Sequence, residues 1–299
     1  MTLNTADTYP KVSVVMTTYN RAGYILESVE SVRSQSYTNW ELVIVDDGST
    51  DETEILIAEL GDPRIRFHKA GKIGLGIRLK HIGIQLCEGD FIAFIDSDDL
   101  WAPDKLNKQV AAMQQYPEAG FSITGGYNFR RLNEPIEFFY KEREGLKYGN
   151  IFFSFFRSEA SILPPTLIIN RHCLQEIQQS IEDSPNSDVE FLLDLAIKFK
   201  AVILYESLFY RRIHDDSFSG KNWEKGYEEG VRLIRLYRNR KMLPDKLADD
   251  ASFRLYINYG ESCLKHKNTK LAIRIFFRSW ISKPFSIVPL KKMVKALFQ

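Results

Sequence analysis

The sequence predicts an α/β fold, in which a mostly parallel Rossmann-like sheet is flanked by helices and followed by a C-terminal helical extension. Apolar runs typical of buried strands alternate with segments of helical spacing between residues 12 and 116. This alternation indicates right-handed β–α–β units on a parallel sheet. Beyond Phe121 the pattern becomes irregular, and after about Gly220 it becomes helical and basic. We therefore expect one domain at residues 1–219 and a basic helical region at residues 220–299.

The first half of the chain supplies four strand–helix pairs. The expected strands are short and apolar, and they lie at Val12–Met16, Trp40–Val45, Ile65–His68 and Phe91–Ile95. Helices follow at residues 24–35, at residues 51–60 with Ser49 or Thr50 as the N-cap, at residues 77–87 and at residues 103–116. Strands that are apolar throughout are buried on both faces, which favours a parallel sheet covered by helices on two sides.

The second half is less regular. We expect a hairpin at residues 125–140, a helix at residues 146–156, an extended run at residues 164–169, a helix at residues 188–199 and a strand at residues 201–205. Gly260, Ala272, Phe276 and Pro284 lie at the offsets of a tetratricopeptide helix pair, and a generic helical hairpin is the alternative. Residues 290–298 place apolar side chains on one helical face and lysines towards the other, a pattern of helices that lie on membranes.

Charge and composition restrict the class of protein. The net charge of +1 conceals 22 basic against 32 acidic residues in 1–219, and 18 against 7 in 220–299. An acidic body suits a bound cation, and a basic tail suits an anionic surface. Three cysteines without metal-type spacing, no signal-peptide pattern and no long apolar segment predict a cytoplasmic protein, with membrane contact at the surface only. No nucleic-acid partner is expected.

Three carboxylates follow the fourth predicted strand, in the segment F-I-A-F-I-D-S-D-D-L-W. Ligands of parallel sheets bind beyond the carboxyl ends of the strands, where Asp96, Asp98 and Asp99 are expected. Unpaired acids at such short spacing repel one another, and Mg²⁺ or Mn²⁺ shared with substrate phosphates relieves the repulsion. The alternative is a solvated acidic turn before the next helix.

Several motifs together resemble the family-2 glycosyltransferases, which have the GT-A fold. V-S-V-V-M-T-T-Y-N-R, W-E-L-V-I-V-D-D-G-S-T-D and the segment with three acids occur in the family's order. P-P-T-L-I-I-N-R, S-D-V-E-F-L-L and Y-R-R-I-H-D-D-S match its later elements. The resemblance covers about residues 11–217. It implies an inverting, metal-dependent transferase that uses a nucleotide-sugar donor, with UDP as the expected nucleotide.

The resemblance also implies roles for single residues. Thr17 and Tyr19 would line the base pocket, with Tyr19 stacked on the base. Asp47 would accept a hydrogen bond from the ring N–H of the base, and its alternative is an acid at a helix N-terminus. Asp96 would approach the ribose or the metal. Asp98 would bind the metal, Mn²⁺ or Mg²⁺.

Two further residues complete the expected site. His214 matches the family's late histidine, which is often a metal ligand. Asp188 is the expected general base, because an acceptor hydroxyl needs a carboxylate to take its proton in the transition state. Glu190 is the second candidate for that role, and a helix N-cap is the alternative reading of Asp188.

The chain departs from the family pattern in two places. Ser187 replaces the first acid of an acidic pair, and Asp188 keeps the second. Lys80-His81 replaces an Arg-Asn pair. Lys80 would bind a phosphate as a point charge, without the bidentate geometry of arginine, and Arg78 is a substitute for the same contact.

We therefore expect sugar transfer to a glycan or lipid-linked acceptor in the synthesis of cell-surface polysaccharide. A sugar-phosphate nucleotidyltransferase is one alternative, although the loop at residues 17–21 lacks its glycine-rich basic signature. A catalytically weak nucleotide-binding scaffold is the other. The basic tail and residues 287–299 are expected to provide peripheral membrane contact on the cytoplasmic face.

Overall fold

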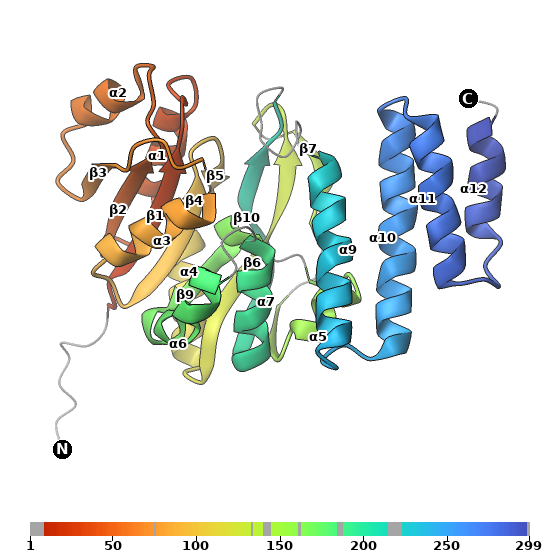
Figure 1. Ribbon diagram of the computed structural model, residues 1–299. Helices are drawn as coiled ribbons and strands as arrows, with labels where there is room; N and C mark the ends of the chain where they lie inside the picture. Colours follow the sequence, from red (N-terminus) through yellow and green to blue (C-terminus); the bar gives the residue numbers. More distant parts are fainter. Residues whose placement is uncertain are drawn as a thin grey trace. The chain divides into compact units, whose positions relative to one another are not determined.

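The computed structural model describes residues 9–74, 76–132, 134–139, 145–160, 163–183, 188–214 and 223–297. The chain forms two compact units. The first contains residues up to 152 and residues 161–213, and the second contains residues 153–160 and the chain from residue 214 onwards. The first unit is built on a sheet and the second on helices (Figure 1).

The first unit has the α/β fold that the sequence predicts. Its parallel half has the strand order β3-β2-β1-β4. These strands span Ile65–Lys69 (β3), Trp40–Asp46 (β2), Val12–Thr18 (β1) and Phe91–Asp96 (β4). The connecting helices span Ile25–Arg33 (α1), Thr53–Glu59 (α2) and Gly76–Leu86 (α3). All four predicted strands are therefore present, and each connection contains the predicted helix.

The sheet continues beyond β4 with mixed strand directions. The order runs β4-β9-β6-β10-β5, where β9 lies antiparallel to both β4 and β6. These strands span Leu167–Asn170 (β9), Ala119–Phe129 (β6), Lys200–Arg212 (β10) and Leu100–Trp101 (β5). Two short strands pair at the side, Pro135–Phe138 (β7) with β6 and Leu146–Gly149 (β8) with β10. The predicted hairpin is thus the β6–β7 pair.

Helices cover both faces of the sheet. Side chains alternate between faces along β1, so Val14 joins the core with α1 and with Leu106 of α4 (Lys105–Gln115), whereas Val15 faces α3. A Cβ atom on Gly83 of α3 would lie 2.4 Å from a Val15 methyl carbon. The glycine therefore lets α3 pack more closely on β1 than a residue with a side chain would allow. α7 (Asp188–Lys198) covers the same face, where Phe191 packs edge-on against Phe94.

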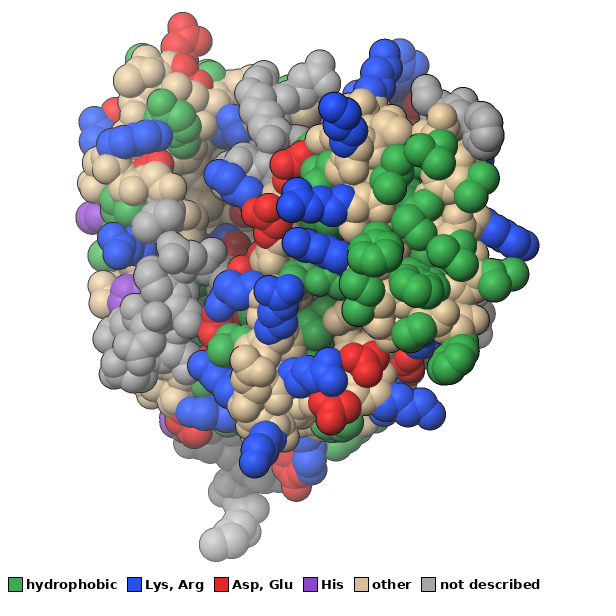
Figure 2. All heavy atoms as spheres, turned by 45° about the vertical axis from the view of Figure 1, so that its right-hand side comes forward, with side chains coloured by type: hydrophobic (Ala, Val, Ile, Leu, Met, Phe, Trp, Pro, Cys, Tyr) green, Lys and Arg blue, Asp and Glu red, His purple; other side chains and the backbone are tan. Residues whose placement is uncertain are grey.

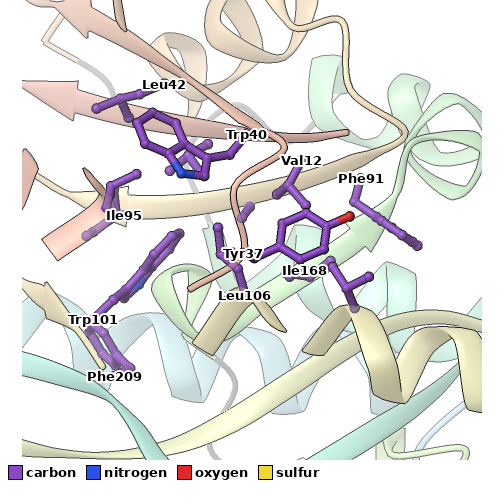
Figure 3. Packing of buried hydrophobic residues seen from close by; sticks show 14 of the residues in the cluster. Val12, Tyr37, Trp40, Leu42, Phe91, Ile95, Trp101, Leu106, Ile168 and Phe209 are labelled. Atoms are coloured by element: carbon purple, nitrogen blue, oxygen red, sulfur yellow. The ribbon is translucent and has the colours of Figure 1, made fainter. Parts of the chain in front are cut away.

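The core on the other face contains large aromatic residues. Trp101 lies next to Phe209, its partner in the β5–β10 ladder, and near Leu106 and Ile95 (Figure 3). The Trp101 indole N–H donates to the Pro165 carbonyl at 3.1 Å. This core fixes β10 against the segment that follows β4, and so brings two distant parts of the sequence to one edge of the sheet.

Two local predictions are wrong. Residues 146–149 are the strand β8, and only α5 (Phe152–Phe156) is helical within the expected helix at 146–156. Tyr148 of β8 stacks on Tyr116, whereas the phenylalanines of the segment lie in α5. The N-cap of α2 is Glu52, and neither Ser49 nor Thr50 caps it.

The extended run at 164–169 begins as a 3₁₀ turn, Pro164–Thr166, before β9. The remaining helix of this unit is α6 (Arg171–Asp183).

The second unit is a row of helices, in which α10 packs on α9, α11 on α10 and α12 on α11. They span Trp223–Asn239 (α9), Asp245–Lys265 (α10), Thr269–Ser282 (α11) and Val288–Leu297 (α12). Gly260 lets the Phe276 ring approach, since a Cβ there would lie 2.3 Å from a ring carbon. Among the described residues, no helix combines the length and apolar character needed to span a bilayer.

Candidate active site

The carboxyl edge of the parallel strands gathers most of the expected site residues. The register pairs Thr17 of β1 with Asp96 of β4, and Thr18 with Asp46 of β2. Tyr19 and Asp47 follow directly after these strands, and Asp98 and Asp99 follow β4. In-register parallel strands end together, so three motifs that are far apart in the sequence meet at one edge of the sheet.

Backbone hydrogen bonds lock the first two motifs together. The Asp46 carboxylate accepts from the N–H groups of Gly48 and Ser49 at 3.1 and 2.9 Å, in a turn where Gly48 has φ +79°. The Ser49 hydroxyl then accepts from the Asn20 N–H at 2.9 Å, and the Asn20 side chain accepts from the Thr50 N–H at 2.8 Å. The motif D-D-G-S-T-D therefore joins the segments that follow β1 and β2, and its first acid has a structural role.

The expected base pocket contains a residue that the motifs did not reveal. Lys72 Nζ lies 3.1 Å from the centroid of the Tyr19 ring and 3.3 Å from Asp47 Oδ2. The Asp47 carboxylate also accepts from the N–H groups of Ile73 and Gly74, at 2.5 and 2.9 Å from Oδ1. Burial raises the pKa of Asp47, but these N–H groups and the Lys72 charge outweigh it and hold the pKa below its usual value. Asp47 is therefore ionised, and the loop at 72–74 covers it.

The acids after β4 are partly buried and interact with one another. Burial, followed by the charges of Asp98 and Asp188, raises the pKa of Asp96, and the Lys80 charge opposes this. Asp99 is 3% exposed, and burial followed by the charges of Asp98 and Asp96 raises its pKa well above the usual value. The carboxylates thus carry an electrostatic cost that a nearby cation would relieve.

Two arginines already lie among these acids. Arg21 Nε is 3.3 Å from Asp98 Oδ2, in a pair whose side chains are 19% and 17% exposed. Arg212, at the end of β10, donates its backbone N–H to Asp99 Oδ1 and its Nε–H to the Asp98 carbonyl, both at 2.9 Å. Asp99 therefore links the turn to β10, whereas the Asp98 carboxylate forms an ion pair with the Arg21 guanidinium group.

The expected general base contacts the expected phosphate-binding lysine. Lys80 Nζ lies 2.7 Å from Asp188 Oδ2, which joins α3 to the first residue of α7 across 108 positions of sequence. The other carboxylate oxygen, Oδ1, is buried and has no hydrogen-bond partner among the described residues. Burial lowers the pKa of Lys80, but the charges of Asp188 and Asp96 outweigh it and raise the pKa above its usual value, so the lysine is charged.

The remaining candidates differ in their positions. Arg78 is exposed, and because it lies two residues from buried Lys80 on α3, the two side chains leave the helix in nearly opposite directions. Glu190 is 3% exposed on α7. His214 falls in the second compact unit, so its expected role beside Asp98 stays a prediction.

The residues fit a divalent metal bound together with a substrate. In the described part of the chain, no group of three or more His, Cys, Asp and Glu side chains forms a complete metal cage. Mg²⁺ and Mn²⁺ do not need one, since they usually take one or two carboxylates together with waters and substrate phosphates. The carboxylate of Asp98, with Asp96 nearby, supplies the hard oxygen ligands that this chemistry requires.

Sequence reasoning missed Arg21, Arg212 and Lys72 as members of the site. Arg21 and Arg212 lie inside the quoted motifs, but only the tertiary fold shows that Arg21 contacts Asp98 and that Arg212 contacts both Asp98 and Asp99. Lys72 follows Gly71 in a loop that the sequence marks only by its glycines. A single basic residue in such a loop has no distinctive spacing, so nothing in the sequence separates it from the other exposed lysines.

A sheet covered by helices on both faces, with acids at the carboxyl edge of its parallel strands, is the architecture of GT-A type glycosyltransferases. Comparison with known proteins agrees: residues 13–177 match the family described as glycosyl transferase family 2. The chain belongs to this family. This assignment supports sugar transfer over nucleotidyl transfer, and the predictions of fold, family and enzyme class are confirmed.

Two of the relatives carry names that describe a glycosyltransferase. TuaG of Bacillus subtilis, named for teichuronic acid biosynthesis, is 30% identical over 72% of this chain and 84% of its own length. WfaP of Escherichia coli, named as a UDP-Glc:alpha-D-GlcNAc-diphosphoundecaprenol beta-1,3-glucosyltransferase, is 29% identical over 72% of this chain and 82% of its own length. Three other relatives are longer, and the match covers about a third or less of each.

Solved structures share the fold. TarS of S. aureus in complex with UDP aligns over 96% of this chain and 88% of its own, with a TM-score of 0.61 and 17% identity. The mannosyltransferase PcManGT of Pyrobaculum calidifontis, in complex with GDP-Man and Mn²⁺, aligns over 98% of this chain and 88% of its own. Its TM-score is 0.56 and its identity 15%.

Proposed function

We propose that this glycosyltransferase moves a sugar, with inversion, from a UDP-sugar to a glycan or lipid-linked acceptor in the synthesis of cell-surface polysaccharide. The observation that carries the proposal is Asp188. One of its oxygens is held by Lys80 at 2.7 Å, and the other has no hydrogen-bond partner among the described residues. The names of TuaG and WfaP support the polysaccharide context, and WfaP supports a lipid-linked acceptor.

The proposed reaction is a direct displacement. The acceptor hydroxyl oxygen forms a bond to the anomeric carbon while the bond from that carbon to the diphosphate breaks, and the diphosphate leaves with the electron pair. The proton of the acceptor hydroxyl passes to Asp188 Oδ1. A divalent cation, held by Asp98 with Asp96, would offset the negative charge that develops on the diphosphate.

Lys80 has two roles in this proposal. It neutralises Asp188, and with a donor bound its ammonium group would also donate to a phosphate through its remaining N–H donors. As the phosphate takes up part of the lysine's charge, the hold on Asp188 weakens and the carboxylate becomes a better base. Donor binding would therefore prepare the base for the acceptor.

The nucleotide would bind between Tyr19 and Asp47. Lys72 contacts both the Tyr19 ring and the Asp47 carboxylate, and it has to leave the ring before a base can stack there. Uracil fits the pocket because Asp47 accepts its ring N–H while Lys72 can donate to a neighbouring carbonyl oxygen. Thr17, next to Asp96 in the sheet, would border the ribose.

Peripheral membrane contact through residues 287–299 belongs to the same proposal. α12 exposes Leu290, Val294 and Leu297, which are 42%, 56% and 68% exposed. Lys291 and Lys295 lie on the same helix, and this combination is typical of helices that lie on anionic bilayers. The expected location is the cytoplasmic face of the membrane, where a lipid-linked acceptor would be presented.

A thermal-shift panel of UDP-, GDP- and dTDP-sugars, with and without Mn²⁺, tests the donor and the metal. A ligand that binds the folded state at a hundredfold excess over its Kd stabilises it by about 2.7 kcal/mol. We expect stabilisation by a UDP-sugar only with Mn²⁺, and its loss in Asp98→Asn but not in the control Asp104→Asn. Stabilisation that is equal without Mn²⁺, or unchanged in Asp98→Asn, would reject the metal role.

A further inference from the structure

Four arginines of the second unit line one hollow on its surface. Arg232 and Arg235 come from α9, and Arg274 and Arg278 come from α11. Spacings of three and four residues place each pair on one face of its helix, so the two pairs border the same space. The hollow measures about 450 Å³.

The charge in this hollow is poorly balanced. Arg232 is paired with Glu229 through two contacts of 2.6 and 2.7 Å, and Glu228 is the one acid among the residues that line the hollow. Residues 262–299 contain nine Lys and Arg and no Asp or Glu. Guanidinium groups that surround one space repel one another, and an anion bound between them offsets this repulsion because it attracts each of them.

The lining suits a phosphate group. Guanidinium groups bind phosphate oxygens in bidentate geometry, and apolar surroundings strengthen such contacts. The hollow also includes Tyr256, Tyr259 and Ile275, which are largely buried. Burial raises the pKa of Tyr259 to about 12, so its hydroxyl keeps its proton at neutral pH.

The neighbouring surface is apolar. Phe277 and Ile281 of α11 are 49% and 58% exposed, and Phe285, after α11, is fully exposed. Figure 2 shows hydrophobic side chains gathered on the right-hand part of the view, with Lys and Arg side chains around them. α11 thus carries two arginines of the hollow together with exposed apolar residues, which is compatible with an amphiphile that carries phosphate as well as with a free phosphate.

We propose that this hollow is a second anion site, which binds a phosphate or diphosphate group and is separate from the nucleotide site. Two sources share this chemistry, a free phosphate compound in solution and the headgroup of a membrane lipid. The proposal does not depend on the transferase chemistry, because none of the four arginines belongs to the unit that carries Asp98 and Asp188.

Calorimetric titration of the full chain with pyrophosphate, in the presence of EDTA, tests the site without metal at the nucleotide site. We expect wild type and Arg240→Gln, an arginine outside the hollow, to bind equally. Arg235→Gln/Arg278→Gln should bind at least ten times more weakly, and added salt should weaken binding to wild type. No binding to wild type, or equal binding to the double variant, would overturn the proposal.

Two further measurements complete the test. Stabilisation of the double variant by UDP with Mn²⁺ should equal that of wild type. This result would show that the double variant is folded and that the anion site is distinct from the nucleotide site. Co-sedimentation with phosphatidylcholine vesicles, with and without phosphatidic acid, distinguishes the sources. Binding that requires phosphatidic acid and is lost in the double variant identifies a lipid headgroup. Pyrophosphate binding without vesicle binding identifies a soluble phosphate compound.

Discussion

The contact between Lys80 and Asp188 is the residue-scale feature with the most chemical consequence. A buried lysine needs a negative partner, and a carboxylate near Asp96 needs a positive one, so each residue makes the charge of the other tolerable. The same contact orients Asp188, because one oxygen is fixed by Lys80 while the second is buried and has no hydrogen-bond partner among the described residues.

Replacement of Asp188 by Asn tests the base. The amide keeps the shape of the side chain but cannot take a proton, and general bases contribute about 10²- to 10⁴-fold to rates. We expect kcat for sugar transfer to fall at least about 100-fold, measured by release of UDP in the presence of acceptor, while donor binding persists. Asp194→Asn on the same helix is the control. Transfer within twofold of wild type would rule out Asp188 as the base.

At the scale of elements, the site depends on how closely α3 packs on the sheet. Gly83 faces Val15 and Val45, and Lys80 lies one turn earlier on the same helix. The short distance between α3 and β1 is what brings the lysine to Asp96 and Asp188. The position of a functional residue is thus set by a glycine that has no chemistry of its own.

Gly83→Ala should therefore affect both stability and function. The added methyl would meet a Val15 side chain at 2.4 Å, and overpacking of this kind costs about 1–3 kcal/mol. We expect a lower Tm together with weaker donor binding, because α3 must move outwards. Gly76→Ala, at the start of α3 with nothing within 4 Å of its added Cβ, is the control. An unchanged Tm would show that α3 accommodates the methyl freely.

A second link between elements lies at Glu41 on β2. Its carboxylate accepts from the Ser13 hydroxyl at 2.5 Å and the Glu88 N–H at 2.7 Å, and it pairs with Arg66 at 2.8 Å. It thereby connects β1, β2, β3 and the turn before β4. Burial raises the pKa of Glu41, but these partners outweigh it and lower the pKa below its usual value.

Glu41→Gln should lower the free energy of unfolding by about 1–3 kcal/mol at neutral pH, the usual cost of leaving buried partners unsatisfied. Because the folded pKa is depressed, the contribution of the carboxylate is present above its unfolded pKa and is lost as pH falls through the folded pKa. The gap between wild type and variant should close below about pH 4, measured by urea unfolding against the exposed control Glu59→Gln. A gap independent of pH would contradict this account.

How far the sequence reveals this site depends on the kind of signal. Thr17, Asp47, Asp96 and Asp98 could be expected at one edge of the sheet because each lies at or just after the end of a visible apolar run, whereas their roles came from the family resemblance. Asp188 could be named through the resemblance, but its contact with Lys80 could not, since no local pattern connects residues on α3 and α7. β8 was missed because a four-residue segment is too short for its pattern to distinguish a strand from part of a helix.

At the scale of the whole molecule, the acidic and basic halves of the sequence correspond closely to the sheet-based and helical units. The catalytic candidates belong to the first unit, and the exposed apolar residues of α11 and α12 belong to the second. Such a division allows one unit to carry out the reaction while the other contacts the surface at which the acceptor is found.

Removal of residues 287–299 should release the protein from anionic vesicles, measured by co-sedimentation. Because Ala296 is buried and its loss can disturb the helical unit, Val294→Ser/Leu297→Ser is a second variant that alters only exposed side chains. We expect weaker vesicle binding in both, and wild-type binding in the control Ile55→Ser, which is 59% exposed on α2. Sedimentation of both variants at the wild-type level would exclude membrane contact through α12.

The lysine that rests on Tyr19 has a kinetic consequence. In the proposed nucleotide site, an ammonium group held by an aromatic ring and a carboxylate would compete with the nucleobase, so Lys72 would have to leave the Tyr19 ring before a nucleotide binds. The observed association rate would then rise with nucleotide concentration and level off at the frequency with which the lysine leaves. After each turnover the lysine would return to its place, which hastens the departure of spent UDP and protects the enzyme from product inhibition.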